Sequence, residues 1–242
     1  EGDISSPYYR DLAFVTYIWI SPYYTMLFSF GKKDDINSGG KQMPSHFSHR
    51  EKGILSQSSP VATQIPHSVG AALALKMNQQ SNIATATVGE GSSNQGDFHE
   101  GLNFAGVHNL PFVCVIINNK YAISVRDRYK AMKEARERAL NGEGTTLIEA
   151  ITTRMTPHSS DDDDTYRSKE ERDAFKTSDC NLKFKNELLD LGIIDEDWLN
   201  ELDNAHKSII DKATKDAENA QYPDVEETYQ YVYDPEGDIF ND

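Results

Sequence analysis

Apolar residues in the middle of the chain form short continuous runs that alternate with runs of helical spacing. Three runs of strand length predict strands: NIATATVG (82–89), LPFVCVIINN (110–119) and TTLIEAITTR (145–154). Three runs of helical spacing predict helices: 66–79, with Pro66 at its first position, 98–108 and 129–140. The second strand is apolar at nearly every position, which is typical of a parallel strand buried on both faces. The order therefore predicts an α/β fold with a doubly wound, mostly parallel sheet.

Two regions flank this unit. Residues 11–30 predict a helix or a helix pair interrupted at Ser21-Pro22, and a polar, glycine-rich loop follows over 31–53. A loop of that length in a compact domain is usually functional or mobile. Beyond residue 166, apolar residues at helical spacing up to Ala217 predict a helical C-terminal extension over 166–242. We expect one domain over 1–242, with this extension as part of it.

Composition narrows the class of protein. Apolar residues make up 38% of the chain and charged residues 26%, as in soluble globular proteins, and no apolar run reaches membrane-spanning length. The net charge of −15 argues against a nucleic-acid partner, because phosphate contacts need clustered Lys and Arg. Cys114 and Cys180 show no metal-like spacing, and the first residues do not resemble a secretory signal. We expect a cytoplasmic protein, or a mitochondrial matrix protein in a eukaryote.

The ends of two predicted strands carry candidate ligands. The loop GEGSSNQG (89–96) follows the first strand, and Asn118-Asn119 ends the second. Ligands of open α/β sheets bind beyond these carboxyl ends, and glycines followed by a helix N-terminus suit a phosphate. Glu90 would repel a bare phosphate, but a cation between them removes the conflict, and Mg²⁺ prefers oxygen ligands. The sequence therefore predicts a metal–diphosphate site that includes Glu90 and Asn119.

Two common nucleotide motifs do not fit this loop. A dinucleotide fingerprint needs glycine at position 94, which is asparagine, and an acidic residue roughly 20 residues further on. The phosphate-binding loop of NTPases needs Gly-Lys-Ser/Thr, which the loop lacks. Taken singly, Glu90 would be a solvated loop carboxylate and Asn119 a turn-capping residue. Only their pairing across two strand ends indicates a site.

The segment GEGSSNQGDFHEGLNFAGVHNLPFVCVIINNKYAIS (89–124) resembles the thiamine-diphosphate motif, which opens with GDG or GEG and closes with NN. Four more segments resemble, in order, the alpha chain of the first component of the branched-chain 2-oxo acid dehydrogenases: YYRDLA, GGKQMPSHF, SSPVATQIPHSVGAALALKM and RMTPHSSDDDDTYRS. The resemblance covers nearly the whole chain. SSPVATQIP and YAIS are more similar to the branched-chain than to the pyruvate enzymes.

The resemblance implies an oxidoreductase that uses thiamine diphosphate and Mg²⁺. Its reaction would be the oxidative decarboxylation of a branched-chain 2-oxo acid such as 3-methyl-2-oxobutanoate, with transfer of the acyl group to a lipoyl acyltransferase core. It also implies a beta subunit in a heterotetramer of two alpha and two beta subunits, and that subunit would supply the carboxylate that activates the aminopyrimidine. Two alternatives stay open: a pyruvate or acetoin dehydrogenase alpha subunit, and a non-catalytic phosphate-binding scaffold subunit.

The matched motifs imply roles for individual residues. The magnesium ligands would be Glu90, the Asn119 side chain and the Tyr121 carbonyl. The residues expected to contact the cofactor are Tyr9, Arg10, Ser59, Val61, Gly89, Glu90, Gly91, Ser92, Asn119, Tyr121, Ala122, Ile123 and His158. A potassium loop is matched by Ser58, Pro60, Thr63 and Gln64, although a proline-bounded helix cap explains the same residues.

His158, in TPHSSDDDD, is the expected catalytic residue, because a histidine beside the cofactor can move protons during acyl transfer. Arg154 is expected to order its loop. Related chains carry regulatory phosphoserines at positions such as Ser159, where phosphate beside four aspartates would repel and disorder the loop. A zinc site at His46-x-x-His49 lacks a third ligand. The other histidines are expected to be packing or surface residues: His67, His99, His108 and His206.

The chain departs from the family after NNKYAISV, where relatives have a few dozen further residues that include another strand and part of the diphosphate-binding loop. Here Val125 runs directly into the helical segment RDRYKAMKEARERA. We expect that a mobile loop is missing between residues 125 and 126, so that these two are not bonded neighbours in the natural chain. The family's N-terminal segment is likewise expected to precede residue 1.

Overall fold

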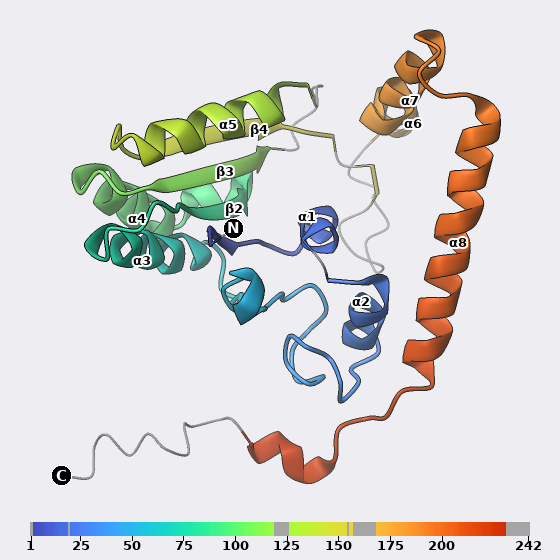
Figure 1. Ribbon diagram of the computed structural model, residues 1–242, viewed down its shortest axis with the longest axis horizontal. Coiled ribbons are helices and arrows are strands. Elements are labelled where there is room, and N and C mark those ends of the chain that lie inside the picture. Colours follow the sequence, from blue (N-terminus) through green and yellow to red (C-terminus); the bar gives the residue numbers. More distant parts are fainter. Residues whose placement is uncertain (1, 19, 119–125, 154, 157–167, 231–242) are drawn as a thin grey trace.

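A four-stranded parallel sheet forms the centre of the molecule (Figure 1). The computed structural model describes residues 2–18, 20–118, 126–153, 155–156 and 168–230. The strands lie in the order of the chain: β1 (Ile4–Ser6), β2 (Ala84–Gly89), β3 (Phe112–Asn118) and β4 (Thr146–Ile151). The three strands expected from the sequence are confirmed. β1 was not predicted, because three residues are too few to show a period of two.

Helices cover both faces of the sheet. α3 (Gln64–Met77) and α4 (Gly96–Val107) lie on one face, and α5 (Arg126–Leu140) lies on the other (Figure 1). The doubly wound α/β fold is therefore confirmed. α3 begins two residues earlier than expected, so that Pro66 is its third residue. The first turn of a helix has backbone N–H groups without helical partners, so proline costs no hydrogen bond there.

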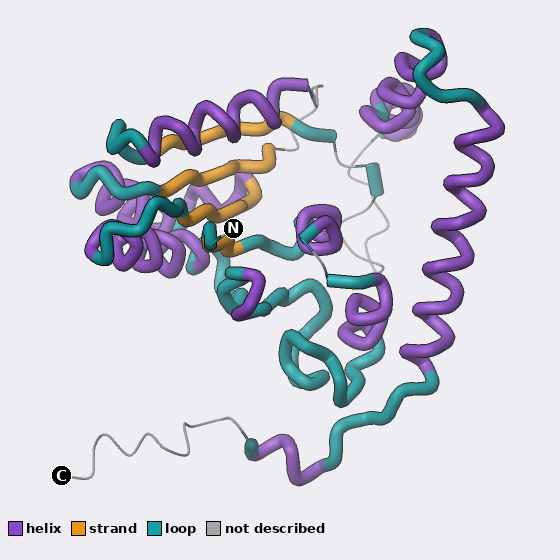
Figure 2. Tube along the Cα trace, in the orientation of Figure 1, coloured by secondary structure: helices purple, strands orange, loops and turns teal. Residues whose placement is uncertain are grey.

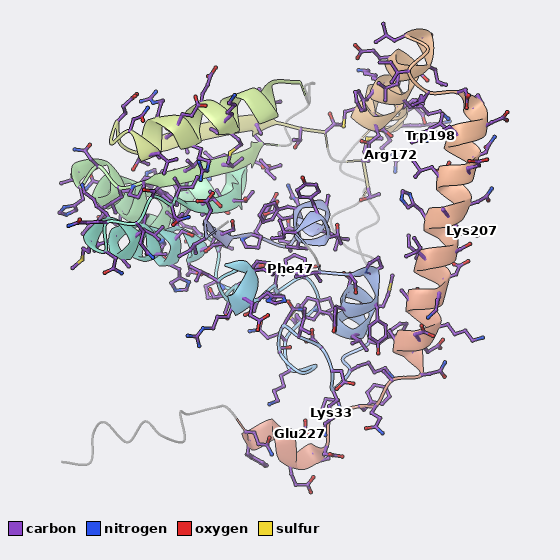
Figure 3. All side chains as sticks on the ribbon, in the orientation of Figure 1. Lys33, Phe47, Arg172, Trp198, Lys207 and Glu227 are labelled. Atoms are coloured by element: carbon purple, nitrogen blue, oxygen red, sulfur yellow. The ribbon has the colours of Figure 1, made fainter. Side chains whose placement is uncertain are left out.

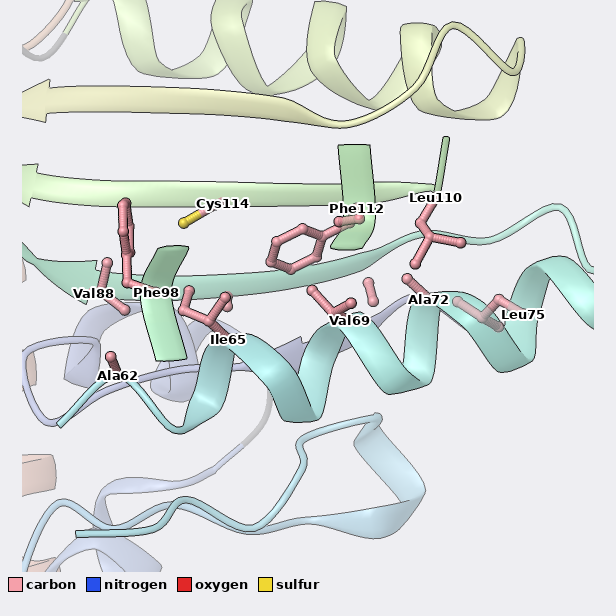
Figure 4. Close-up of a cluster of buried hydrophobic side chains, with 13 residues drawn as sticks. Ala62, Ile65, Val69, Ala72, Leu75, Val88, Phe98, Leu110, Phe112 and Cys114 are labelled. Atoms are coloured by element: carbon pink, nitrogen blue, oxygen red, sulfur yellow. The ribbon is translucent and has the colours of Figure 1, made fainter. Parts of the chain in front are cut away.

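The main core fills the space between β2, β3 and the two helices on that face (Figure 4). Its fully buried side chains include Ile65 and Ala72 of α3, Val88 of β2 and Phe112 of β3. Removing each large side chain from water contributes about 1.5–3 kcal/mol. On the opposite face, Val113 packs with α5 through small residues, Ala135 and Ala139. Both faces of β3 are thus buried, as its continuous apolar run predicted.

The N-terminal helices and the long loop form a second packed unit. α1 (Leu12–Tyr17) and α2 (Pro22–Ser29) confirm the expected helix pair, and Ser21 caps α2. Between α2 and α3 the chain is almost entirely loop, with one short 3₁₀ helix, η1 (Arg50–Lys52) (Figure 2). The buried carboxylate of Asp35 accepts hydrogen bonds from groups of Asn37, Ser38 and Gly40. Phe47 is fully buried against Phe28 and Val15.

The C-terminal region is helical, with α6 (Lys169–Ser178), α7 (Cys180–Asp190), the long α8 (Glu196–Glu218) and a 3₁₀ helix, η3 (Val225–Tyr229). α8 packs along α2. Lys32, which is buried just after the end of α2, donates hydrogen bonds to the carbonyls of Glu218 (2.9 Å) and Ala220 (3.1 Å) at the end of α8. Its neighbour Lys33 pairs with Glu227 (Figure 3). Among the helices described, none is long and apolar enough to cross a membrane.

Gly101 of α4 is required by the close approach of α3. A Cβ at Gly101 would lie 2.7 Å from Cγ2 of Ile65, whereas a Cβ at Gly106 on the same helix would meet no heavy atom within 4 Å. Gly101→Ala should lower the free energy of unfolding by roughly 1–3 kcal/mol through overpacking. The matched control, Gly106→Ala, should raise it by up to about 1 kcal/mol through helix propensity. Urea unfolding measures both, and equal effects would contradict the contact.

Asp3 joins the start of β1 to two other elements. Its carboxylate accepts from the backbone N–H of Ile83 (3.0 Å) and from Nε of Arg136 in α5 (3.0 Å). Partial burial would raise the pKa of Asp3, but Arg136 and the Ile83 N–H together hold this pKa below its ordinary value. The charged carboxylate therefore stabilises the fold above pH 3.8, and this contribution is lost as the pH falls through the lowered pKa.

We accordingly expect Asp3→Asn to be less stable than the parent chain at pH 7, with the difference shrinking as the pH falls below about 4. Urea unfolding at several pH values measures the difference. Asp216→Asn, at the exposed ion pair with Lys212, is the control and should change little at any pH. A difference for Asp3→Asn that stays constant down to pH 2 would show that the charge of this carboxyl group does not stabilise the fold.

Candidate functional site

The carboxyl ends of β1, β2 and β3 meet at one edge of the sheet (Figure 1). Parallel pairing sets this geometry, because Ser6 lies beside Ala86 and Gly89 lies beside Ile117. The residues that follow each strand are therefore neighbours, although they come from distant parts of the sequence. They are the segment 8–10 after β1, the glycine loop after β2 and Asn118 at the end of β3.

The glycine loop forms a short 3₁₀ helix, η2 (Glu90–Asn94), which leads into α4. None of Gly89, Gly91 and Gly96 has a positive φ, so the backbone conformation does not require glycine at these positions. Packing does not require glycine at Gly91 or Gly96 either, because the space beside the loop is open. Within the described residues, a Cβ at Gly91 or Gly96 would meet no heavy atom within 4 Å. A ligand can thus approach the backbone here, close to the N–H groups in the first turn of α4.

Arg10 supplies a positive charge at this edge. Its guanidinium carbon lies 5.3 Å from the ring centre of Tyr9 and 5.8 Å from that of Tyr8. A turn in which the backbone N–H of Tyr8 donates to the carboxylate of Asp11 (2.8 Å) holds this segment. Partial burial tends to lower the pKa of Arg10, but the two tyrosines and then Glu90 raise it above its ordinary value. The side chain therefore stays charged beside the glycine loop.

Tyr8 and Tyr9 occupy different environments. Their rings contact each other edge to face, with centres 5.0 Å apart. Tyr9 is 42% exposed, whereas Tyr8 is 4% exposed. A Cβ at Gly89 would lie 3.8 Å from Cε2 of Tyr8, so the hydroxyl side of this ring lies against the glycine loop. The matched motif implied a role for Tyr9 and none for Tyr8, and the packing adds that Tyr8 is the buried one of the two.

The segment before α3 gathers oxygen atoms. The hydroxyls of Ser58 and Thr63 are hydrogen-bonded to each other, and Oγ1 of Thr63 also lies 3.0 Å from the carbonyl oxygen of Pro60. Nε2 of Gln64 donates to the carbonyl of Thr87 in β2 (3.2 Å). The buried Ala62 has a left-handed φ of +72°, which bends the chain sharply here. Two hydroxyls and a carbonyl so close together fit a monovalent cation, which prefers oxygen ligands.

Ser59 lies exposed at the tip of the same segment, next to the exposed Val61. Its Oγ is 2.9 Å from Nε2 of His46, whose Nδ1 lies 3.0 Å from the carbonyl oxygen of Met43. A carbonyl only accepts, so Nδ1 of His46 carries a proton and donates to the carbonyl of Met43, while Nε2 is hydrogen-bonded to the Ser59 hydroxyl. From the sequence, the one hypothesis for His46 was a zinc site with His49. No sequence spacing predicted that His46 contacts Ser59. The described residues contain no group of three His, Cys, Asp or Glu side chains able to hold a metal ion.

Part of the expected site lies outside the described residues. This applies to the second half of the thiamine-diphosphate motif and to the histidine segment, with Asn119, Tyr121, Ala122, Ile123, Arg154, His158 and Ser159. Their roles stay predictions. The described part brings together Tyr9, Arg10, Gly89, Glu90, Gly91 and Ser92 at one sheet edge.

A charged arginine, a glycine loop and a carboxylate lie at the carboxyl edge of a parallel sheet, which is where α/β proteins bind their ligands. The chain belongs to the Dehydrogenase E1 component family, whose sequence profile matches residues 1–130 and 127–226. Proteins of this family depend on thiamine diphosphate. The described residues fit thiamine diphosphate. They offer the guanidinium of Arg10, open space over Gly91 and Gly96, and the buried hydroxyl of Tyr8 beside the loop.

Two kinds of relative were found. The chain is 44% identical over 264 aligned residues to the 2-oxoisovalerate dehydrogenase subunit alpha of Bacillus subtilis, an alignment that covers 96% of this chain and 80% of that protein. It is 31% identical to the pyruvate dehydrogenase E1 component subunit alpha of Staphylococcus aureus, over 97% of this chain and 69% of that protein. The corresponding subunit of Bacillus subtilis pyruvate dehydrogenase is also 31% identical.

The first alignment spans 264 positions, more than the 242 residues of the chain, so this relative has positions without a counterpart here. The two segments matched by the family profile overlap at residues 127–130. An interruption of the family pattern near residue 126 would produce both observations. Residues 119–125 lie outside the described part of the chain, so the expected gap between 125 and 126 stays a prediction.

Proposed function

We propose that the chain is the alpha subunit of a branched-chain 2-oxo acid dehydrogenase, which decarboxylates acids such as 3-methyl-2-oxobutanoate. The observation that carries the proposal is the difference in identity: 44% to a 2-oxoisovalerate dehydrogenase alpha subunit against 31% to pyruvate dehydrogenase alpha subunits, over nearly the same length of chain. A substrate preference depends on the residues that line the pocket, so this difference favours the branched acid without defining the pocket itself.

The described residues would bind and orient the cofactor. Thiamine diphosphate, when bound, supplies the electron sink for decarboxylation. Arg10 would hold the diphosphate, because its planar fork matches phosphate oxygens. Gly89, Gly91 and the N–H groups at the start of α4 would contact the same anion from the backbone. Ser59 and Val61, both exposed on the adjoining segment, would face the organic part of the cofactor.

Two cations complete the proposal. Glu90 would bind Mg²⁺ together with the Asn119 amide and the Tyr121 carbonyl, since Mg²⁺ favours a carboxylate with neutral oxygens and phosphates. The hydroxyls of Ser58 and Thr63, with the carbonyl of Pro60 and the side-chain oxygen of Gln64, would hold K⁺. Supporting this second site, Oγ1 of Thr63 lies within hydrogen-bonding reach of both Oγ of Ser58 and the carbonyl oxygen of Pro60.

Catalysis needs groups beyond those of the sheet edge. His158 would transfer protons while the acyl group passes to lipoamide, with a lipoyl acyltransferase core as acceptor. E1 alpha subunits of 2-oxo acid dehydrogenases pair with beta subunits. For this chain we propose a heterotetramer of two alpha and two beta subunits, in which a beta-subunit carboxylate activates the aminopyrimidine. The alpha chain then holds the cofactor without containing the complete active site.

The substrate is tested by combining the chain with its beta subunit, thiamine diphosphate and Mg²⁺. Decarboxylation of 3-methyl-2-oxobutanoate and of pyruvate is measured with an artificial electron acceptor. The kcat/KM for the branched acid should exceed that for pyruvate by at least about tenfold. The reverse preference would make this a pyruvate-type subunit. Absence of turnover with both acids, and with acetoin, would instead favour a non-catalytic scaffold.

The metal site is tested with Glu90→Gln, which keeps the shape of the side chain and removes its charge. The Mg²⁺ concentration that gives half-maximal thiamine-diphosphate binding should rise at least about tenfold, since a lost charged ligand costs more than 1.4 kcal/mol. Glu100→Gln, on the exposed side of α4, is the matched control and should bind as the parent does. If both variants keep the parent's Mg²⁺ requirement, Glu90 is not a ligand.

A further inference from the structure

We propose that Lys32 is a positioning residue of the cofactor site: it fastens the C-terminal segment 218–230 to the loop after α2, and this loop sets the position of Ser59. The inference rests on the proposed function, in which Ser59 faces the organic part of the cofactor. None of the motif matches assigned a role to Lys32. The inference follows from the burial of this lysine, from its partners and from a chain of hydrogen bonds that leads from it towards Ser59.

Lys32 is buried just after the end of α2, with 1% of its surface exposed. Its Nζ donates to the carbonyls of Glu218 (2.9 Å) and Ala220 (3.1 Å) and lies 3.5 Å from the ring centre of Tyr222. The last carbonyls of a helix have no partner inside the helix, so the lysine satisfies groups that the end of α8 leaves open. The lysine in turn depends on these partners, because burial has removed its water. Lys32 and the C-terminal segment therefore hold each other in place.

Two further lysines of the loop contact the same segment. The backbone N–H of Lys33 donates to the carbonyl of Gln221 (2.9 Å), and its side chain pairs with Glu227 (Figure 3). Further along the loop, Nζ of Lys41 donates to the carbonyl of Gln230 (3.3 Å). The side chains of Lys33 and Lys41 stay accessible to water, and polar contacts at the surface contribute little to stability. Lys32 is the buried one of the three, so we expect it to contribute most to holding the segment.

A chain of hydrogen bonds leads from Lys32 through the loop. The carbonyl of Lys32 accepts from the N–H of Asp35 (3.1 Å), whose buried carboxylate accepts from Nδ2 of Asn37 (2.8 Å). Oδ1 of Asn37 accepts from the N–H of Ser48 (2.9 Å). Oγ of Ser48 lies 2.7 Å from Oγ of Ser56, in the segment that leads to α3. A displacement at residue 32 would therefore reach the far end of the loop through consecutive contacts.

The far end of the loop places His46 against Ser59. Nε2 of His46 is 2.9 Å from Oγ of Ser59, and the N–H of Gln57 donates to the carbonyl of Phe47 (3.1 Å). In the described part of the chain, the contact with His46 is the one hydrogen bond of the Ser59 side chain. If the loop moves, Ser59 loses the contact that orients its hydroxyl. Lys32 would thus affect cofactor binding without touching the cofactor.

The test is a double-mutant cycle of Lys32→Met and Ser59→Ala, with each variant in complex with the beta subunit and Mg²⁺. Methionine keeps an unbranched apolar stem and removes the donor. Calorimetry measures the dissociation constant of thiamine diphosphate, which Lys32→Met should raise about three- to tenfold when Ser59 is present. In the Ser59→Ala background, the same substitution should change this constant by less than about twofold. Lys212→Met, at the exposed ion pair with Asp216 on α8, is the matched control and should bind as the parent does.

A purely structural role of Lys32 predicts that Lys32→Met weakens binding by the same factor in both backgrounds. That result would overturn the inference, and so would an unchanged affinity. Tyr222→Ala replaces Lys32→Met if that variant does not fold, because Tyr222 is 66% exposed and contacts Nζ of Lys32 from outside the core. It should raise the dissociation constant about two- to fivefold with Ser59 present, and less than about twofold in the Ser59→Ala background. Equal effects in the two backgrounds would again overturn the inference.

Hydrogen exchange of the complex without cofactor gives a measurement that does not depend on the proposed function. The backbone amides of residues 33–48 should exchange faster in Lys32→Met than in the parent, whereas those of β2 and β3 should not change. Unchanged exchange in the loop would overturn the inference even where the complex binds thiamine diphosphate normally. If the parent complex itself bound no thiamine diphosphate, the proposed function would fall first, and the inference with it.

Discussion

Parallel pairing of β1, β2 and β3 is the constraint on which the site depends. It brings residues 8–10, 89–92 and 118 to one edge, although they are far apart in sequence. β1 is only three residues long, and Asp3 at its start supports it by bonding to the N–H of Ile83 and to Arg136. Gly53 also contributes, since its carbonyl accepts from Ser5. The position of Arg10 is therefore determined by contacts at the other end of a very short strand.

Local charge at the edge runs against the charge of the whole chain. The protein carries a net charge of −15, and yet its candidate ligand is an anion. Screening limits long-range repulsion at physiological salt to about 8 Å, so nearby groups decide the local potential. Arg10 is held charged by its neighbours, and the start of α4 adds partial positive charge. Glu90 opposes both, and the proposed Mg²⁺ would lie between this carboxylate and the anion.

Sequence patterns predicted the elements that bury apolar surface and the residues of the matched motifs. The periodicity of apolar residues predicts β2, β3, β4 and α3 to α5, because each of these strands and helices buries an apolar face or stripe. The contact between Ser59 and His46 did not follow, because it depends on how the loop after α2 folds back. The burial of Tyr8 did not follow either, because its ring packs beside the glycine loop, far away in sequence. Tyr8 and Tyr9 are chemically identical and adjacent. Only the three-dimensional packing separates the exposed ring from the buried one.

The edge strand β4 bears on whether the natural sheet has a further strand. β4 is the last strand in the described sheet, and Leu147 and Ile151 are 50% and 46% exposed. Leu147 pairs with Cys114 and shares its face, where α3 and α4 cover β2 and β3 but not β4. An edge strand leaves a row of unpaired backbone N–H and C=O groups with which a further strand can pair. A sheet that lacks one strand would look like this, and the two segments that the family profile matches overlap at residues 127–130, at the start of α5.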